Sequence, residues 1–334
     1  MAPAQVSLSP AELSYLHTSL SQTPPIRPDS RSPTQFRPLV AETDILPSTN
    51  GSARICFADG TEAVVGVKAE VEKSRSAGGV NGETSQEARE GEDSWVEIAI
   101  EIPGFRDDDP LPVFLSAMLT EALLADGALK DRLWINRRFH WRLYVDVLLL
   151  SAPLSYPLPL LSLTTHLALL RTRLPALKSE GDEDPLFNDD WDASVYLYSP
   201  SLNKPPVTLL VMSVSSNIIF DPSREELAVA DAVLAISVAQ TEASITLVAM
   251  RAVDPPSRLT TPGVPNSINT STGGTAPTTT QEALTVRENA DAQSVWRPPR
   301  GGMKRALVAQ MVKMVVEKGG VGQEVMEGLQ GVEA

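Results

Sequence analysis

The chain has 334 residues, 42% of them hydrophobic, so it can bury a core of full domain size without disulfides or a structural metal. Its formal net charge of −14 argues against a free-standing nucleic-acid or membrane-surface binder, since such proteins normally carry a basic excess. The single cysteine excludes an intramolecular disulfide and fits a reducing compartment. No membrane-length apolar run and no signal-peptide pattern is seen, so the expected location is the cytosol or the nucleus.

Residues 1–30 are expected to form a short helix followed by an arm. Ser9 and Glu12 have the spacing of a capping box, with a proline in the first helical turn. The apolar face of this helix would consist of Leu13, Leu16 and Leu20. Prolines within residues 23–29 end the helix. Residues 30–38 are expected to be extended, and the only cations nearby are Arg27, Arg31 and Arg37.

Residues 31–175 have the patterns of a first α+β domain. Period-2 alternation and an Asp59-Gly60 turn predict an antiparallel meander, which is followed by a segment rich in Gly, Ser and Glu. A further strand and a helix come next. The expected elements are strands at 39–43, 53–57, 62–71 and 95–102, and a helix that opens at Pro110 or Pro112 and ends near Asp126-Gly127.

Residues 139–175 predict a strand, a tight loop and a helix in immediate succession. Apolar residues alternate from Trp141 to Leu149, and leucines recur at helical spacing from Leu160 until Pro175. Many folds hold a phosphate in such a unit, using a Gly-rich loop at the helix N-terminus. The loop in this chain contains no glycine.

Residues 195–334 predict a smaller second unit. The expected strands are 195–198, 207–214, 218–220, 233–238 and 245–250, and a helix is expected at 303–318. The segments 74–94, 179–194 and 254–294 have compositions typical of flexible or disordered insertions. Without them a compact core of about 250 residues remains. The expected class is α+β, as one domain or as two fused βα units.

No metal or nucleophilic site is indicated. The histidines His17, His140 and His166 are scattered without metal-ligand spacing, and one cysteine cannot complete a zinc site. Cys56 is expected to be a small buried hydrophobic residue rather than a nucleophile. His166 lies on a leucine-rich helix face, where a packed core or interface histidine is expected.

Acidic residues near the second unit are the best candidates for carboxylate chemistry or a divalent metal. They are Asp221, Glu225, Glu226 and Asp231. The segment from Asp221 to Glu226 also has the pattern of a turn and a helix start, where acids complement the helix dipole. This second interpretation is favoured.

One cluster combines basic and aromatic residues. It consists of Lys130, Arg132, Arg137, Arg138, Phe139, Trp141 and Arg142. Strand alternation would place Arg138, His140 and Arg142 on one face. A solvated sheet edge is the favoured interpretation, and an RNA-contacting face formed by Arg137, Arg138 and Arg142 is the alternative.

Motifs along the ordered part of the chain resemble the RNase PH-like ring subunits of the eukaryotic RNA exosome. They are Ser9-Pro-Ala-Glu-Leu-Ser-Tyr15, Ile26-Arg-Pro-Asp-Ser-Arg31, Phe36-Arg-Pro38, Leu46-Pro-Ser-Thr-Asn-Gly-Ser52, Asp59-Gly60, Val64 to Lys68, Leu143-Tyr-Val-Asp146, and Phe220-Asp-Pro222 with Glu225-Glu226. Within that family the chain is most similar to the ribosomal-RNA-processing subunits of the forty-two type. The resemblance implies an RNase PH-like fold with long insertions, in which 31–175 and 195–334 are its two domains.

The resemblance also implies a catalytically inactive subunit with no cofactor. Active phosphorolytic relatives hold inorganic phosphate with a Gly-Thr-Arg or Gly-Ser-Arg loop, and that place is occupied here by residues 151–159. Two aspartates of those relatives align with Leu227 and Val233, and an arginine pair aligns with Glu121 and Leu124. At Ser30 the family motif usually has glycine.

The partners that the resemblance implies are those of a ring. They are other RNase PH-like subunits, with the mRNA-transport-regulator type as the dimer mate, together with RNA-binding cap subunits, a hydrolytic nuclease and single-stranded RNA in the channel. The implied location is the nucleus and nucleolus, and also the cytoplasm. Two alternatives stay open. One is an active exoribonuclease that uses Asp221, Glu226 and Asp231 with Arg137 and Arg138, and the other is a sibling ring subunit.

Overall fold

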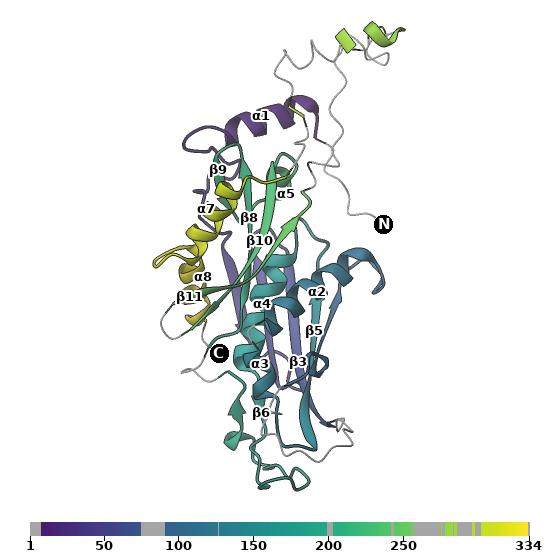
Figure 1. The fold of residues 1–334 in the computed structure, drawn as a ribbon, viewed down its shortest axis with the longest axis vertical. Helices are drawn as coiled ribbons and strands as arrows, with labels where there is room; N and C mark the ends of the chain where they lie inside the picture. The colour runs from purple at the N-terminus through teal and green to yellow at the C-terminus, as the bar shows by residue number, and fades with distance from the viewer. Residues whose placement is uncertain are drawn as a thin grey trace, which may run out of the picture.

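The computed structural model describes residues 8–74, 91–125, 127–198, 203–241, 244–255 and 302–332, with a few residues between 257 and 297. Two sheets lie on either side of one central helix, α4 (Leu158–Arg171) (Figure 1). Residues 158 to 169 of this helix are all buried. Most of its side chains are apolar, and the hydroxyls of Thr164 and Thr165 donate to backbone carbonyls of the same helix, which suits its place between the sheets.

The first sheet has five strands and is mixed. In spatial order they are β1 (Leu39–Thr43), β2 (Gly51–Phe57), β3 (Glu62–Lys73), β5 (Phe139–Leu149) and β4 (Val96–Glu101). Only β4 and β5 are parallel. The helix α2 (Pro110–Leu124) connects β4 to the short helix α3 (Ala128–Arg132) and packs on β4. Buried and exposed residues alternate along β3 and β5, because one face of the sheet lies toward α4 and the other face is left uncovered by the helices that the structure describes.

The second sheet has four antiparallel strands, in the order β11 (Ile245–Val253), β10 (Ala232–Gln240), β8 (Val207–Val214) and β9 (Asn217–Phe220). Every residue of β8 is buried, and α4 packs on this strand. The helices α7 (Arg305–Val316) and α8 (Val321–Gln330) pack on β10. The expected α+β class with mixed and antiparallel sheets is therefore confirmed.

The N-terminal helix α1 (Pro10–Leu20) is confirmed together with its Ser9–Glu12 capping box. It leads into the arm of residues 21–38, where Ser30 adopts a left-handed backbone conformation with φ 62°. The glycine expected by the family motif at this position would adopt that conformation without steric cost.

Several predicted elements needed correction. The helix expected at 303–318 is present as α7, Arg305–Val316, and a further helix, α8, which was not anticipated, follows it beyond Gly319, whose φ is 73°. The strand expected at 245–250 extends to Val253, and α3 was not anticipated. The central helix ends at Arg171 rather than near Pro175, and it is followed by the short strand β6 (Arg173–Leu174), which pairs with β7 (Val195–Tyr196). In the described part of the chain, no helix is long and apolar enough to cross a membrane.

The proposed insertions are described to different extents. Most of 74–94 and 254–294 lies outside the described residues. Residues 179–194 are described throughout and include the 3-10 turn η2 (Trp191–Ala193). A similar turn, η1 (Asp93–Trp95), leads into β4.

A close approach between β2 and the end of α4 gives a first prediction. A Cβ atom added to Gly51 would lie 2.6 Å from the backbone N and Cα of Thr172. Gly51→Ala is therefore expected to lower the free energy of unfolding by about 1–3 kcal/mol, as measured by urea titration. Gly328→Ala is the matched control, because nothing lies within 4 Å of its added Cβ. Equal behaviour of the two variants would contradict this account.

Candidate functional site

The loop of residues 151–159, which the resemblance aligns with a phosphate-binding loop, is short of hydrogen-bond donors. Pro153 lies in the loop, Pro157 is the N-cap of α4 and Pro159 lies in its first turn, so three backbone positions lack an N–H group. Two hydroxyl groups of the loop already have partners. Ser151 Oγ accepts from the backbone N of Glu62 at 3.0 Å, and Ser155 Oγ accepts from Arg37 Nη1 at 2.9 Å. Burial raises the pKa of Tyr156 to about 12, so this side chain stays neutral.

A buried ion pair lies close to this loop. Arg27 Nε and Nη2 donate to the two carboxylate oxygens of Glu226 at 2.7 and 2.8 Å, and both side chains are 0% exposed. Arg27 also donates to the backbone carbonyls of Phe220 and Asp221 at 3.2 and 3.0 Å. A bidentate, fully hydrogen-bonded pair of this kind is the geometry in which a buried ion pair is tolerated.

The carboxylate of Asp221 is held by two further arginines of the arm. Arg31 Nη1 donates to Oδ2 at 2.8 Å, and Arg37 Nη2 donates to Oδ1 at 2.7 Å. The backbone N of Arg37 adds a hydrogen bond to Oδ2 at 2.8 Å. Asp221 itself has a left-handed backbone conformation with φ 45°. We call Arg27, Arg31, Arg37, Asp221 and Glu226 the arginine-carboxylate cluster.

Arg37 extends this cluster to the first sheet. Its Nη1 lies 2.6 Å from Oδ2 of Asp59, in the turn between β2 and β3. Burial alone would lower the pKa of Arg37, but the hydrogen bond and charge of Asp221, with those of Asp59, outweigh burial and raise it. Burial would raise the pKa of Asp59, but hydrogen bonds from Thr61 and the charge of Arg37 lower it overall. Both groups therefore stay charged.

The favoured capping interpretation of residues 221–226 is confirmed. Ser223 Oγ accepts from the backbone N of Glu226, and Glu226 Oε2 accepts from the backbone N of Ser223, at the start of α5 (Arg224–Leu227). Both oxygens of Glu226 and of Asp221 already accept hydrogen bonds within the protein. Among the described residues, no group of three or more His, Cys, Asp or Glu side chains could hold a metal.

The remaining candidates for carboxylate chemistry, Glu225 and Asp231, are dispersed, and Glu225 is exposed in the first turn of α5. Asp231 Oδ2 accepts from the backbone N of Ser215 at 2.6 Å, so it closes a turn of the second sheet. Glu121 Oε2 lies 2.6 Å from Arg251 Nη2 across the α2–β11 contact. Leu227 and Val233 are buried in the core. These side chains form no common site.

The basic and aromatic cluster lies at the other end of the molecule from α5, beside β6 and residues 179–194 (Figure 1). Each predicted RNA-contacting arginine has an acidic partner. Arg137 Nε lies 3.8 Å from Asp182 Oδ2, and Arg138 Nη2 lies 3.0 Å from Asp184 Oδ1. Arg142 bridges Glu72 and Glu97 at 3.0 and 2.9 Å across β3, β5 and β4.

The exposure expected for His140 was wrong, although its side chain does share a face with Arg142, since both approach Oε2 of Glu72. Its ring is buried and stacks on Trp95, with ring centroids 4.3 Å apart, instead of lying exposed beside Arg138 and Arg142. Burial lowers the pKa of His140, although Glu72 and Glu92 oppose this shift. Cys56 is half-buried rather than fully buried. The prediction for His166 is confirmed, since it is completely buried and its Nδ1 lies 2.8 Å from the carbonyl oxygen of Pro205.

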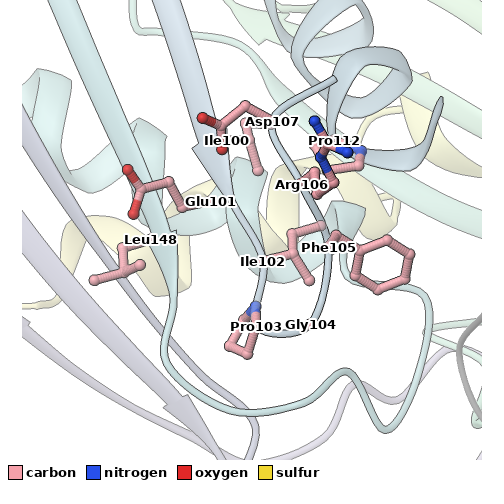
Figure 2. Close-up of a pocket in the computed structure, with 10 residues that line it drawn as sticks. All are labelled: Ile100, Glu101, Ile102, Pro103, Gly104, Phe105, Arg106, Asp107, Pro112 and Leu148. Carbon is pink, nitrogen blue, oxygen red and sulfur yellow. The ribbon is translucent and has the colours of Figure 1, made fainter. Parts of the chain in front are cut away.

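A hollow of about 270 Å³ lies where β4 and β5 end (Figure 2). The loop from Pro103 to Asp107 lines one side, and Glu101 and Leu148 line the other. Arg106 pairs with Asp108 at 3.2 Å. No histidine, cysteine or hydroxyl side chain is among the described residues that line the hollow, and its charged side chains are those of Glu101, Arg106 and Asp107.

Comparisons with known proteins agree with this geometry. Residues 35–175 match the model of the 3′ exoribonuclease family, domain 1. Exosome complex component RRP42 of Saccharomyces cerevisiae is 35% identical over 238 residues, which span 70% of this chain and 82% of that protein. Exosome complex component rrp42 of Schizosaccharomyces pombe is also 35% identical, over 249 residues spanning 70% and 79% of the two chains.

Two solved structures share the fold. An archaeal exosome core aligns with a TM-score of 0.53 and 22% identity over 73% of this chain and 85% of the other. The Archaeoglobus fulgidus exosome with RNA bound to the active site aligns with a TM-score of 0.54 and 23% identity over 73% and 87%. The RNase PH-like fold expected from the sequence motifs is thereby confirmed.

The buried ion pair predicts a large loss of stability when it is broken. Arg27→Met leaves the Glu226 carboxylate buried without its cation, so the free energy of unfolding should fall by about 3–5 kcal/mol in a urea titration. Arg54→Met is the control. Arg54 pairs with Glu42 and Glu62 at the surface, so its substitution should lower the free energy of unfolding much less. The double variant Arg27→Met/Glu226→Met should recover part of the loss. Equal losses for Arg27→Met and Arg54→Met would refute the buried pair.

His166 predicts a pH dependence of stability. Burial lowers its pKa from 6.5 to about 4, so between these values the unfolded chain binds a proton that the folded chain does not. The free energy of unfolding should therefore fall as the pH drops from 6.5 toward 4, by up to about 1.4 kcal/mol per pH unit from this group. His166→Leu should remove this contribution from the pH dependence of the free energy of unfolding, and the control His17→Leu should leave it unchanged. Parallel curves for wild type and His166→Leu would contradict the prediction.

Proposed function

Because the chain belongs to the RNase PH-like family of exosome core components that includes yeast RRP42, we propose that it is a non-catalytic structural subunit of the exosome core ring. In this role it supports 3′ to 5′ RNA processing and degradation, including maturation of ribosomal RNA, by forming part of the RNA channel. The observation that carries the absence of catalysis is the arginine-carboxylate cluster. It occupies the carboxylates that an enzymatic site would need, beside a loop without a phosphate cradle.

The structure also supports a role in assembly. The face of the first sheet that α4 does not cover carries exposed apolar side chains, among them Val40, Leu148 and Leu150 at its end. We propose that the chain contacts other RNase PH-like ring subunits, with the mRNA-transport-regulator type as its dimer mate. Cap subunits and a hydrolytic nuclease complete the proposed complex, in the nucleus and nucleolus and in the cytoplasm. We further propose that 31–175 and 195–334 are its two domains.

The proposal is tested by affinity purification of the tagged protein from its own cells, with mass spectrometry and a phosphorolysis assay on the eluate. We expect five other RNase PH-like proteins and cap subunits, and no phosphate-dependent release of nucleoside diphosphates. Activity that is lost in an Asp221→Asn variant would support the exoribonuclease alternative instead. Recovery of the protein alone, or as a homo-oligomer that consumes phosphate, would overturn the proposal and reopen the exoribonuclease alternative. Cross-links to a different dimer mate would assign the chain as a sibling ring subunit.

We retain the hypothesis that Arg137, Arg138 and Arg142 contact RNA. In the assembled complex, Arg137→Gln/Arg138→Gln should weaken binding of single-stranded RNA and lower the slope of log affinity against log salt by about 0.7 for each lost phosphate contact. The control Arg106→Gln/Arg251→Gln removes the same charge from two other exposed arginines. An equal effect of both double variants, or no effect of either, would reject a specific contact.

A further inference from the structure

A structured arm projects beyond the two sheets at the end where β6 lies (Figure 1). We call residues 177–195 the acidic arm. Its base is closed by the pairing of Leu174 with Val195. A bridge joins Leu177 to Phe187, and the backbone N of Lys178 donates to the carbonyl of Leu186 at 2.7 Å. Phe187 packs against Trp141 of β5 with ring centroids 4.9 Å apart, so the arm is fixed to the first sheet.

The charge of this arm is strongly negative and only partly compensated. It contains seven acidic residues and one lysine. Asp182 and Asp184 pair with Arg137 and Arg138 of the same chain. Glu180, Glu183 and Asp189 are exposed, and none of them pairs with a basic side chain in the part of the chain that the structure describes. The surface of the arm therefore attracts cations and repels phosphates.

Large apolar side chains are exposed on the same arm. The exposed fractions are 45% for Leu177, 64% for Leu186, 47% for Trp191 and 60% for Val195. Exposed leucine and tryptophan side chains on a fixed scaffold are typical of a surface that another protein covers, where tryptophan often contributes much of the binding energy.

We propose that the acidic arm is a docking surface for a basic segment of another protein that carries its own apolar side chains. The apolar residues would supply the contact area, and the unpaired carboxylates would select a positively charged partner. RNA and anionic lipid are disfavoured because their phosphates would meet Glu180, Glu183 and Asp189. This proposal does not depend on the catalytic state of the chain.

The test measures, by fluorescence anisotropy, the binding of a labelled peptide composed of Arg, Leu and Trp to the full chain. Leu186→Ser/Trp191→Ser and Glu180→Gln/Glu183→Gln/Asp189→Asn should each weaken binding at least tenfold. All the substituted side chains are exposed, so the variants should unfold in urea at the wild-type midpoint. A peptide with Ser in place of Leu and Trp should bind the wild type at least tenfold more weakly.

The matched control is Glu101→Gln/Asp107→Asn/Asp108→Asn, which removes three carboxylates near the hollow of Figure 2 and should leave binding unchanged. Equal weakening by this control would reduce the effect to net charge and overturn the proposal. So would unchanged binding in Leu186→Ser/Trp191→Ser. An oligouridylate probe that binds the arm more tightly than the peptide would assign the surface to RNA instead.

Discussion

The contact between Arg27 and Glu226 joins parts of the chain that are 199 positions apart. Removing two charges from water is costly, and the cost is offset only when every donor and acceptor of the pair is satisfied. Here the Arg27 guanidinium also donates to the carbonyls of Phe220 and Asp221. The N-terminal arm of residues 21–38, β9 and α5 must therefore be placed together for the pair to form. Arg37 then connects Asp221 to Asp59 and Ser155. The arginine-carboxylate cluster thus joins the N-terminal arm, both sheets and the loop before α4.

This arrangement explains how a fold shared with exosome cores can hold buried carboxylates that stabilise the structure. Asp221 and Glu226 are charged and buried, as catalytic carboxylates often are, yet their oxygens are bound by arginines and backbone N–H groups. At the start of α4, prolines remove N–H donors that a phosphate would need. The same residues that would be examined first for catalysis are therefore explained by the stability of the junction between the sheets.

The features of the molecule that are suited to recognising a partner lie on its surface. One end of the molecule carries the acidic arm and its ion pairs with Arg137 and Arg138. Exposed pairs of this kind are weak and are screened by salt, so they can exchange with a partner more easily than the arginine-carboxylate cluster can. The end that holds the arginine-carboxylate cluster is therefore a fixed structural junction. The end that holds the acidic arm is a charged surface whose ion pairs a partner can displace.

Local patterns in the sequence determined the elements whose stability is local. The capping boxes at Ser9 and Ser223 and the alternation in β3 and β5 depend on neighbours within a few residues or on one buried face, so the α+β class and most element positions were predictable. Only the tertiary structure decided which distant charges meet. Arg27, Arg31 and Arg37 showed only as isolated cations, because no sequence period relates them to Asp221 and Glu226. His140 was assigned to a solvated sheet edge because strand alternation does not reveal that Trp95, in the turn before β4, stacks on its ring. The helix α8 was missed although its buried residues Val321, Met326 and Leu329 lie on one helical face, a local signal that the sequence carries.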